Sequence, residues 1–215
     1  MRALISVSDK SKLDEFAKEL ISLNYEILAT GGTYRFLREH GISALKVEDV
    51  TGYGEMLGGR VKTLHPKIHG AILARNTEDL KEYKIMPIDM VVVNLYPFEK
   101  YRDADEDTMI ENIDIGGVAL LRAAAKNYER VIVVSSPEQY EEVISLLREN
   151  GMNKEKRREL ALEAFAKTAA YDIMIYNALW KKFRNDMPEH FLYHGKKAMD
   201  LRYGENPHQR GAYYS

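Results

Sequence analysis

Short apolar runs alternate along the chain with segments in which apolar residues recur at helical spacing. The runs at residues 2–7 and 25–29 have the length of buried strands, and each is followed by a polar or glycine-containing turn. Between them, Leu13, Phe16 and Leu20 recur every three or four residues, as on one face of a helix. Repetition of strand, turn and helix is typical of a parallel sheet covered by helices, with right-handed connections.

The same alternation predicts the later elements. Ile88–Leu95 is almost wholly apolar, which favours a central strand covered on both faces. Further strands are predicted at 42–47 and 131–134, and Ser8 or Asp9 is the candidate N-cap of the first helix. A second helix is predicted to begin near Tyr34. Further helices are predicted at residues 105–113, 118–127, 137–149 and 154–184. The sequence therefore predicts a three-layer, Rossmann-like α/β fold, in which a mainly parallel sheet has helices on both faces.

The helix predicted at residues 154–184 is unusually long. About thirty residues of continuous helix would extend roughly 45 Å, which exceeds the width of a small domain. We expect this segment to bend or to pack against a second subunit.

Composition narrows the class of protein. The 215 residues carry a formal net charge of -2 and 45% hydrophobic residues, so neither nucleic acid nor a membrane is expected as a partner. The absence of cysteine excludes disulfides, thiol nucleophiles and cysteine metal sites. Since no apolar run reaches membrane-spanning length and the first residues lack a signal-peptide pattern, a cytoplasmic enzyme or binding protein is expected.

The segment Gly58–Pro66 has the composition of an anion-binding loop. Its two glycines allow a tight turn or the close approach of a ligand. In extended chain Arg60 and Lys62 point to the same side, and Thr63 adds a hydroxyl. Pro66 opposes continuation as a regular helix. A solvated basic loop is the alternative interpretation.

Four turns lie where open α/β sheets bind ligands, outside the carboxyl ends of strands. They are Ser8–Lys10, Thr30–Thr33, Asn94–Tyr96 and the break around Asp114. The first two lead into helices whose free amide groups and positive dipole ends favour phosphate. Taken alone, each of these two is better explained as a capped turn. Together with the basic loop they indicate a ligand that carries one phosphate group.

Other polar residues have structural explanations. His65 and His69 are spaced like a zinc-binding pair, but Pro66 stands where the general-base glutamate of such a motif belongs, and no third ligand is evident. No metal is therefore expected. Lys126 closes an alanine-rich helix, where a lysine commonly interacts with the helix C-terminus, and Asp114 alone would serve as an N-cap.

Several longer motifs resemble one family. In one-letter code they are SVSDK at residues 6–10, GGRVKTLHP at 58–66, NLYPF at 94–98, IDIGGV at 113–118 and LRAAAKN at 121–127. The family is the IMP cyclohydrolase domain of the bifunctional purine-biosynthesis enzyme AICAR transformylase/IMP cyclohydrolase, whose fold is methylglyoxal-synthase-like. The resemblance covers residues 1 to about 185. Residues 201–209 resemble the opening of the family's transformylase domain, including its substrate-binding positions at Arg202 and Tyr203.

The resemblance implies closure of the formylated AICAR nucleotide (FAICAR) to IMP with loss of water, the last step of de novo purine biosynthesis. It implies that Lys62 and Tyr96 donate to the developing oxyanion, and that Asp114 and Lys126 move protons. It also places a further set around the substrate: Ser8, Asp9, Lys10, Thr30, Gly31, Gly32, Thr33, Arg60, Val61, Thr63, Val93, Asn94, Ile115 and Gly116. No cofactor or metal is implied for this activity, and 10-formyltetrahydrofolate would serve only the absent transformylase domain.

The resemblance also implies an organisation into parts. Residues 1–187 would form the cyclohydrolase domain, 188–199 a linker, and 200–215 the incomplete start of a transformylase domain, so formyl transfer is not expected from this chain alone. A homodimer is favoured.

A straight helix at 118–125 rises about 12 to 15 Å. Asp114 and Lys126 can therefore meet at one substrate only through a broken helix or a second subunit.

Two other functions stay open. A non-catalytic, nucleotide-binding regulatory module of the same fold would need the phosphate cradle without all four catalytic residues. Methylglyoxal synthase itself would need an acidic catalytic set in the early loops, which the sequence does not show.

Overall fold

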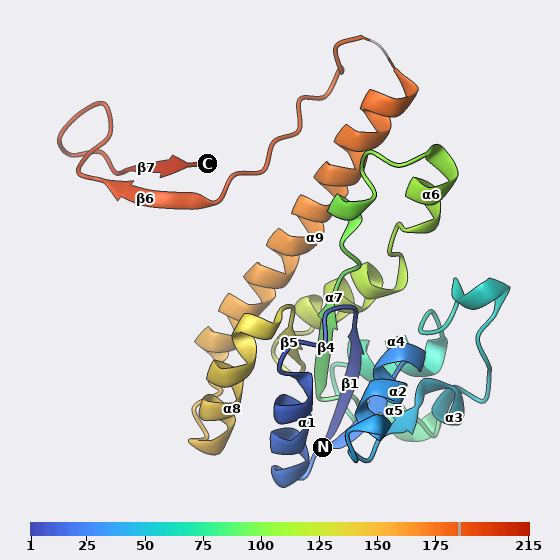
Figure 1. Ribbon diagram of the computed structural model, residues 1–215. Helices are drawn as coiled ribbons and strands as arrows, with labels where there is room; N and C mark the ends of the chain where they lie inside the picture. Colours follow the sequence, from blue (N-terminus) through green and yellow to red (C-terminus); the bar gives the residue numbers. More distant parts are fainter. Residues whose placement is uncertain (185) are drawn as a thin grey trace.

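A five-stranded parallel sheet forms the centre of the computed structural model, which describes residues 1–184 and 186–215 (Figure 1). Its strands lie in the order β3-β2-β1-β4-β5, with the bounds Leu45–Lys46, Glu26–Ala29, Arg2–Val7, Met90–Asn94 and Ile132–Val134. In the central pair, Ala3 lies opposite Met90 and Val7 lies opposite Asn94. Both strands are buried along almost their whole length, because helices cover the two faces. The predicted α/β fold is confirmed.

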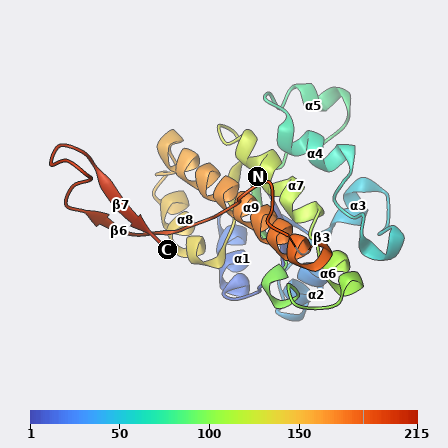
Figure 2. The same cartoon turned by 90° about the horizontal axis from the view of Figure 1, so that it is seen from above.

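Helices cover both faces of the sheet (Figure 2). α1 (Leu13–Ser22), α2 (Gly31–Glu39) and α8 (Tyr140–Arg148) lie on one face, where the rings of Phe16 and Tyr140 stack with centroids 4.1 Å apart. The other face is covered by two helices that pack against each other, α4 (Pro66–Leu73) and α7 (Gly116–Lys126). The connections on either side of β4 contain the short helices α3 (Val47–Thr51), α5 (Asp79–Glu82) and α6 (Glu106–Glu111).

The start of the first helix differs from the prediction. α1 begins at Leu13, and neither Ser8 nor Asp9 caps it. The Asp9 carboxylate instead accepts hydrogen bonds from the N–H and hydroxyl of Ser11, at 2.9 and 2.6 Å. Lys12 then takes a left-handed conformation, with φ of 57°, before the helix begins. The turn after β1 is therefore longer than a simple cap and leaves residues 8–10 at the edge of the sheet.

Several other boundaries differ from the prediction, including the start of α2, which lies at Gly31 and not near Tyr34. The third strand is confined to Leu45–Lys46, since α3 begins at Val47. Pro66 begins α4 instead of preventing a helix, because the first helical position needs no N–H donor. The helix predicted from Val118 already begins at Gly116. α4 starts at a proline capped by His65, and the Asp114 carboxylate accepts from the Gly117 N–H beside the start of α7. Neither signal gives an apolar periodicity.

α9 (Lys154–Phe183) is one helix of 30 residues without a break. Its first half buries residues such as Leu160 in the main core. Its second half packs on a separate cluster around Phe98, Met109 and Tyr171. The segment between β4 and α7 thus fills the space beside the helix, so the expected bend is not needed. Within the described residues, no helix is both long and apolar enough to cross a membrane.

The chain after α9 leads to an antiparallel hairpin that lies apart from the sheet (Figure 1). Its strands are β6 (Lys197–Leu201) and β7 (Gly211–Tyr214), and every residue of β6 is exposed. A two-stranded hairpin without a packed face is only marginally stable by itself.

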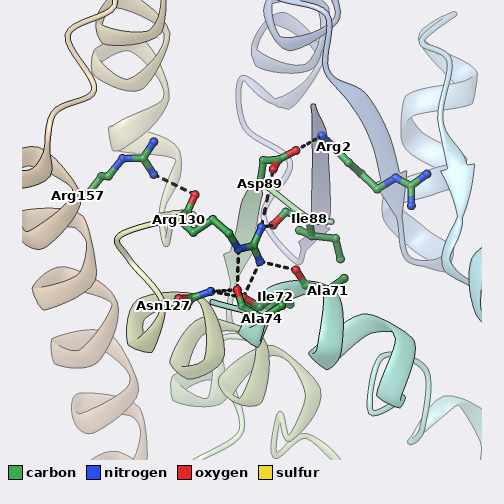
Figure 3. A network of polar contacts seen from close by, with 9 residues as sticks. All are labelled: Arg2, Ala71, Ile72, Ala74, Ile88, Asp89, Asn127, Arg130 and Arg157. Carbon is green, nitrogen blue, oxygen red and sulfur yellow. Dashed lines mark hydrogen bonds and ion pairs between the residues drawn. The ribbon is translucent and has the colours of Figure 1, made fainter. Parts of the chain in front are cut away.

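Arg130 joins the C-terminal end of α4 to the start of β4 (Figure 3). At distances from 2.5 to 3.0 Å its guanidinium donates to four main-chain carbonyl oxygens, those of Ala71, Ile72, Ala74 and Ile88. The Asp89 carboxylate lies 3.8 Å away. Asn127 adds two hydrogen bonds to the carbonyls of Ile72 and Ala74, at 2.7 and 2.9 Å. These contacts fix α4 against the end of α7.

Replacing Arg130 with methionine should lower the free energy of unfolding by about 3 kcal/mol, because the main-chain carbonyl oxygens lose their donor and the Asp89 carboxylate loses its neighbouring cation. The midpoint of thermal unfolding, followed by circular dichroism, should fall by roughly 6 to 12 °C. Arg102→Met is the control, since that guanidinium is exposed and pairs with the adjacent Asp103. An equal loss in both variants would contradict the joint described here.

Candidate functional site

The carboxyl ends of β1 and β4 meet where the connections of the sheet change direction, which in open α/β sheets is the ligand crevice. Asn94 bridges the two ends. Its Oδ1 accepts hydrogen bonds from the N–H groups of Ser8 and Asp9, at 2.6 and 2.8 Å, and its Nδ2 donates to the Asp9 carbonyl at 2.8 Å. Lys10 Nζ donates to the carbonyls of Val7 and Ser8, and burial lowers the pKa of Lys10. The predicted turn 8–10 and Asn94 therefore lie together.

The turn after β2 leaves the start of α2 without a side-chain cap. Thr30 precedes the helix, yet its hydroxyl donates to Ser6 Oγ at 2.9 Å. Thr33 is buried, and its hydroxyl accepts from the N–H of Val7 and donates to the Val7 carbonyl, at 3.1 and 3.2 Å. Both threonines tie α2 to β1, so the first amide groups of α2 stay available for a ligand.

The two cations of the basic loop point to different partners. Arg60 takes a helical conformation, with φ of -63° and ψ of -27°, so the extended segment predicted there is wrong. Arg60 pairs with Glu111 of α6, which raises the pKa of Arg60 and lowers that of Glu111. Lys62 pairs with Glu55 of the preceding turn, at 3.1 Å.

A cavity of about 290 Å³ opens beside the first turn of α2, and its lining combines predicted site residues with others that sequence reasoning missed. The full lining is Gly31, Gly32, Tyr34, Arg35, Lys46, Glu48, Glu55 and Lys62. Arg35 stands one turn after the start of α2, and helical side chains lean back toward the N-terminus, so its spacing from the glycines was an available signal. Glu55 offered no such signal, because its approach depends on the fold of the loop.

Asp114 lies half-buried just before α7. Its Oδ1 accepts a hydrogen bond from the Gly117 N–H at 2.7 Å, and the main-chain N–H of Tyr96 also donates to the carboxylate. Burial raises the pKa of Asp114, while these two hydrogen bonds oppose the shift. The Asp114 N–H donates to the hydroxyl of Tyr171 at 2.8 Å. A carboxyl group with a raised pKa next to Tyr96, whose side chain is exposed, suits proton transfer.

Two glycines allow the close approach of other groups to the start of α7. A β-carbon at Gly116 would lie 3.1 Å from Thr63 Oγ1, and one at Gly117 would lie 2.5 Å from Asp114 Oδ2. Thr63 is buried, whereas Ile115 between the carboxylate and the helix is exposed. The basic loop and the Asp114 carboxylate therefore meet at one helix end.

An open groove of about 660 Å³ runs along α7. Its lining includes the predicted Asp114, Ile115 and Lys126, together with His69, Leu73, Ile113, Val118, Ala119, Arg122, Ala123, Phe165 and Asp172. Because α7 is continuous, the twelve-residue separation places Asp114 and Lys126 roughly 18 Å apart along the helix axis. The broken helix considered as an alternative is wrong, and the two residues lie toward opposite ends of one groove.

The two remaining predicted residues, Val93 and Val61, have structural contacts. Val93 is 1% exposed and lies opposite Ser6 within the sheet, so its side chain belongs to the core. Val61 pairs with Met56 across the basic loop, where the Met56 N–H donates to the Val61 carbonyl at 3.0 Å.

The two histidines serve separate purposes. His65 Nδ1 accepts from the Lys67 N–H at 3.1 Å and caps α4. His69 lines the groove along α7, where burial lowers its pKa. The described part of the chain holds no group of three potential metal ligands.

The fold occurs in known proteins. Residues 12–119 match the family model of the MGS-like domain. This class of domain agrees with the α/β fold and its five-stranded parallel sheet. Residues 124–215 match the model described as the AICARFT/IMPCHase bienzyme. The chain belongs to the MGS-like domain family, and its match to the bienzyme model bears out the resemblance that the sequence motifs predicted.

Relatives support the same family. The bifunctional purine biosynthesis protein PurH of Persephonella marina (strain DSM 14350 / EX-H1) is 52% identical over 99% of this chain and 43% of its own length. The protein of the same name from Thermoanaerobacter sp. (strain X514) is 50% identical over 99% of this chain and 44% of its own. The chain therefore spans less than half the length of these relatives. The crystal structure of ForH matches with a TM-score of 0.78 and 36% identity, over 86% of this chain and 100% of ForH.

Asp114→Asn should raise the thermal unfolding midpoint at pH 7 by a few degrees. Burial raises the pKa of Asp114 in the folded state, so its charge costs stability once the pH exceeds the ordinary value of 3.8. That cost develops fully above the folded pKa, and the gain from asparagine should shrink as the pH falls toward 4. Unfolding scans at several pH values measure it. Asp172→Asn, the same charge change in the same groove, is the control; equal gains would contradict a specific cost at Asp114.

Proposed function

We propose that this chain is the IMP cyclohydrolase part of a bifunctional purine-biosynthesis enzyme, and that it closes the formylated AICAR nucleotide to IMP with loss of water. The observation that carries the proposal is the convergence of Asp114, Tyr96 and Thr63 at the start of α7. The relatives support it, since they are named bifunctional purine biosynthesis proteins. We assign residues 1–187 to the cyclohydrolase, 188–199 to a linker and 200–215 to the start of a transformylase domain, in a cytoplasmic protein.

The proposed substrate closes on itself. The carboxamide nitrogen attacks the formyl carbon and loses one proton, so that a C–N bond forms and the formyl C=O opens to an oxyanion. The formamide nitrogen then loses its proton as it forms a C=N bond to the same carbon, and the formyl oxygen leaves with both protons as water. Both groups belong to one molecule, so the protein must mainly select the closing conformer, stabilise the oxyanion and move protons. Asp114 accepts the N–H proton, a role for which its raised pKa is suited. Lys62 and Tyr96 donate to the oxyanion. The step balances without a cofactor or metal.

The crevice offers separate places for the parts of a nucleoside monophosphate. The phosphate binds at the turns after β1 and β2, near Lys10 and the uncapped start of α2. The base lies toward Asn94, Ile115 and Gly116, where the ends of β4 and α7 meet. This arrangement places the reacting groups beside Asp114.

Lys126 acts, in this proposal, in the site of a second subunit. In a homodimer with two-fold symmetry the same surface of each copy meets the other. The groove along α7 suits such an interface because it exposes apolar side chains, including Ile115 and Phe165, between Asp114 and Lys126. The partner subunit's Lys126 can then reach the ligand that Asp114 contacts.

Lys62→Met should reduce the rate of IMP formation from the formylated nucleotide by roughly 100- to 1,000-fold, as expected for loss of one oxyanion donor. Ultraviolet absorbance measures IMP formation. Lys81→Met, an exposed lysine of α5, is the control. Tight IMP binding without turnover by the unsubstituted chain would instead support a non-catalytic nucleotide-binding module.

Mixing two inactive variants tests the shared site. Asp114→Ala and Lys126→Ala should each be nearly inactive alone. After subunit exchange in equal amounts, half of the dimers are mixed, and each mixed dimer has one intact site of two. The mixture should therefore recover about a quarter of the unsubstituted activity. No recovery, although exchange is demonstrated by mass spectrometry, would exclude a site built from two subunits.

A further inference from the structure

The Glu55 carboxylate occupies the cavity beside the start of α2. Lys62 Nζ lies 3.1 Å from Glu55 Oε1, and both side chains are about one-third exposed. A β-carbon at Gly31 would lie 2.9 Å from Glu55 Oε1, and one at Gly59 would lie 3.2 Å from Oε2. The carboxylate is thus packed between the first residue of α2 and the basic loop, in a place that two glycines keep open.

The surroundings of this carboxylate favour an anion. Three cations line the cavity, Arg35, Lys46 and Lys62, and α2 begins there without a side-chain cap. Two acids, Glu48 and Glu55, face them. A phosphate dianion added to both acids would give the cavity an excess of negative charge. With Glu55 displaced, the three cations balance Glu48 and the dianion.

Glu55 lies in an exposed turn, where its side chain can rotate away from Lys62 while the main-chain pair of Met56 with Val61 stays in place. The turn follows α3 and begins at Gly52, which takes a φ of 77°. Tyr53 and Met56 on either side of Glu55 are both more than half exposed. A segment with few buried contacts opens with a small free-energy change.

We propose that Glu55 is an internal competitor for the anion site, so that the phosphate of the incoming ligand displaces its carboxylate from Lys62 and from the start of α2. The identity of the ligand, a nucleoside monophosphate, rests on the proposed function, whereas competition with phosphate does not. Displacement frees Lys62 to donate to the ligand. The site therefore presents this cation only when the phosphate is bound.

Titration calorimetry of the full chain at fixed ionic strength tests the competition, with inorganic phosphate and IMP as probes. Glu55→Gln keeps the shape of the side chain and removes its charge, so both probes should bind about tenfold more tightly, equivalent to about 1.4 kcal/mol. Glu82→Gln makes the same change of net charge on the exposed end of α5 and should leave both affinities unchanged. Circular dichroism checks folding, and Glu55→Ala replaces the first variant if that variant does not fold.

Unchanged or weaker phosphate binding by the Glu55 variants would overturn the inference, and weaker binding would show that Glu55 holds Lys62 in position. Equal tightening in Glu82→Gln would also overturn it, as a general effect of charge. Tighter phosphate binding without IMP binding by any variant would support the competition and count against the proposed function.

Discussion

The side-chain amide of Asn94 holds the two strand ends between which the connections of the sheet change direction. Its three hydrogen bonds to Ser8 and Asp9 satisfy main-chain groups that would otherwise face the crevice. They also fix the turn that carries Lys10 relative to β4. The start of α2 is positioned against this junction, because Thr30 and Thr33 tie it to β1.

α7 connects the candidate site at its N-terminal end to α4 at its C-terminal end. Its N-terminal end gathers Asp114, Thr63 and the main chain at Tyr96, and its C-terminal end is held to α4 through Asn127. A carboxylate at a helix start gains from the amide groups there and loses hydration through burial. The two effects oppose each other at Asp114, which keeps a proton acceptor of raised pKa in a fixed orientation.

Hydrophobic periodicity predicted most of the fold but little of the local geometry of the site. The parallel strands, α1 and the long α9 followed from apolar spacing, because burial determines those positions. The start of α1 was missed since the Asp9 side chain forms a local turn with Ser11 instead of a cap. The different partners of Arg60 and Lys62 depend on a helical φ and ψ at Arg60, and on acids from two different parts of the fold. No spacing along the chain contains that information.

The joint at Arg130 contacts mostly the main chain, with the Asp89 carboxylate as its one ion-pair partner among the described residues. Four of its acceptors are peptide oxygens, which any residue at 71, 72, 74 or 88 would present equally well. Packing alone therefore restricts the identities of those residues, whereas the arginine is restricted by geometry. Mutational drift in the interior can alter the neighbours of this joint while the spacing between the ends of α4 and α7 stays the same.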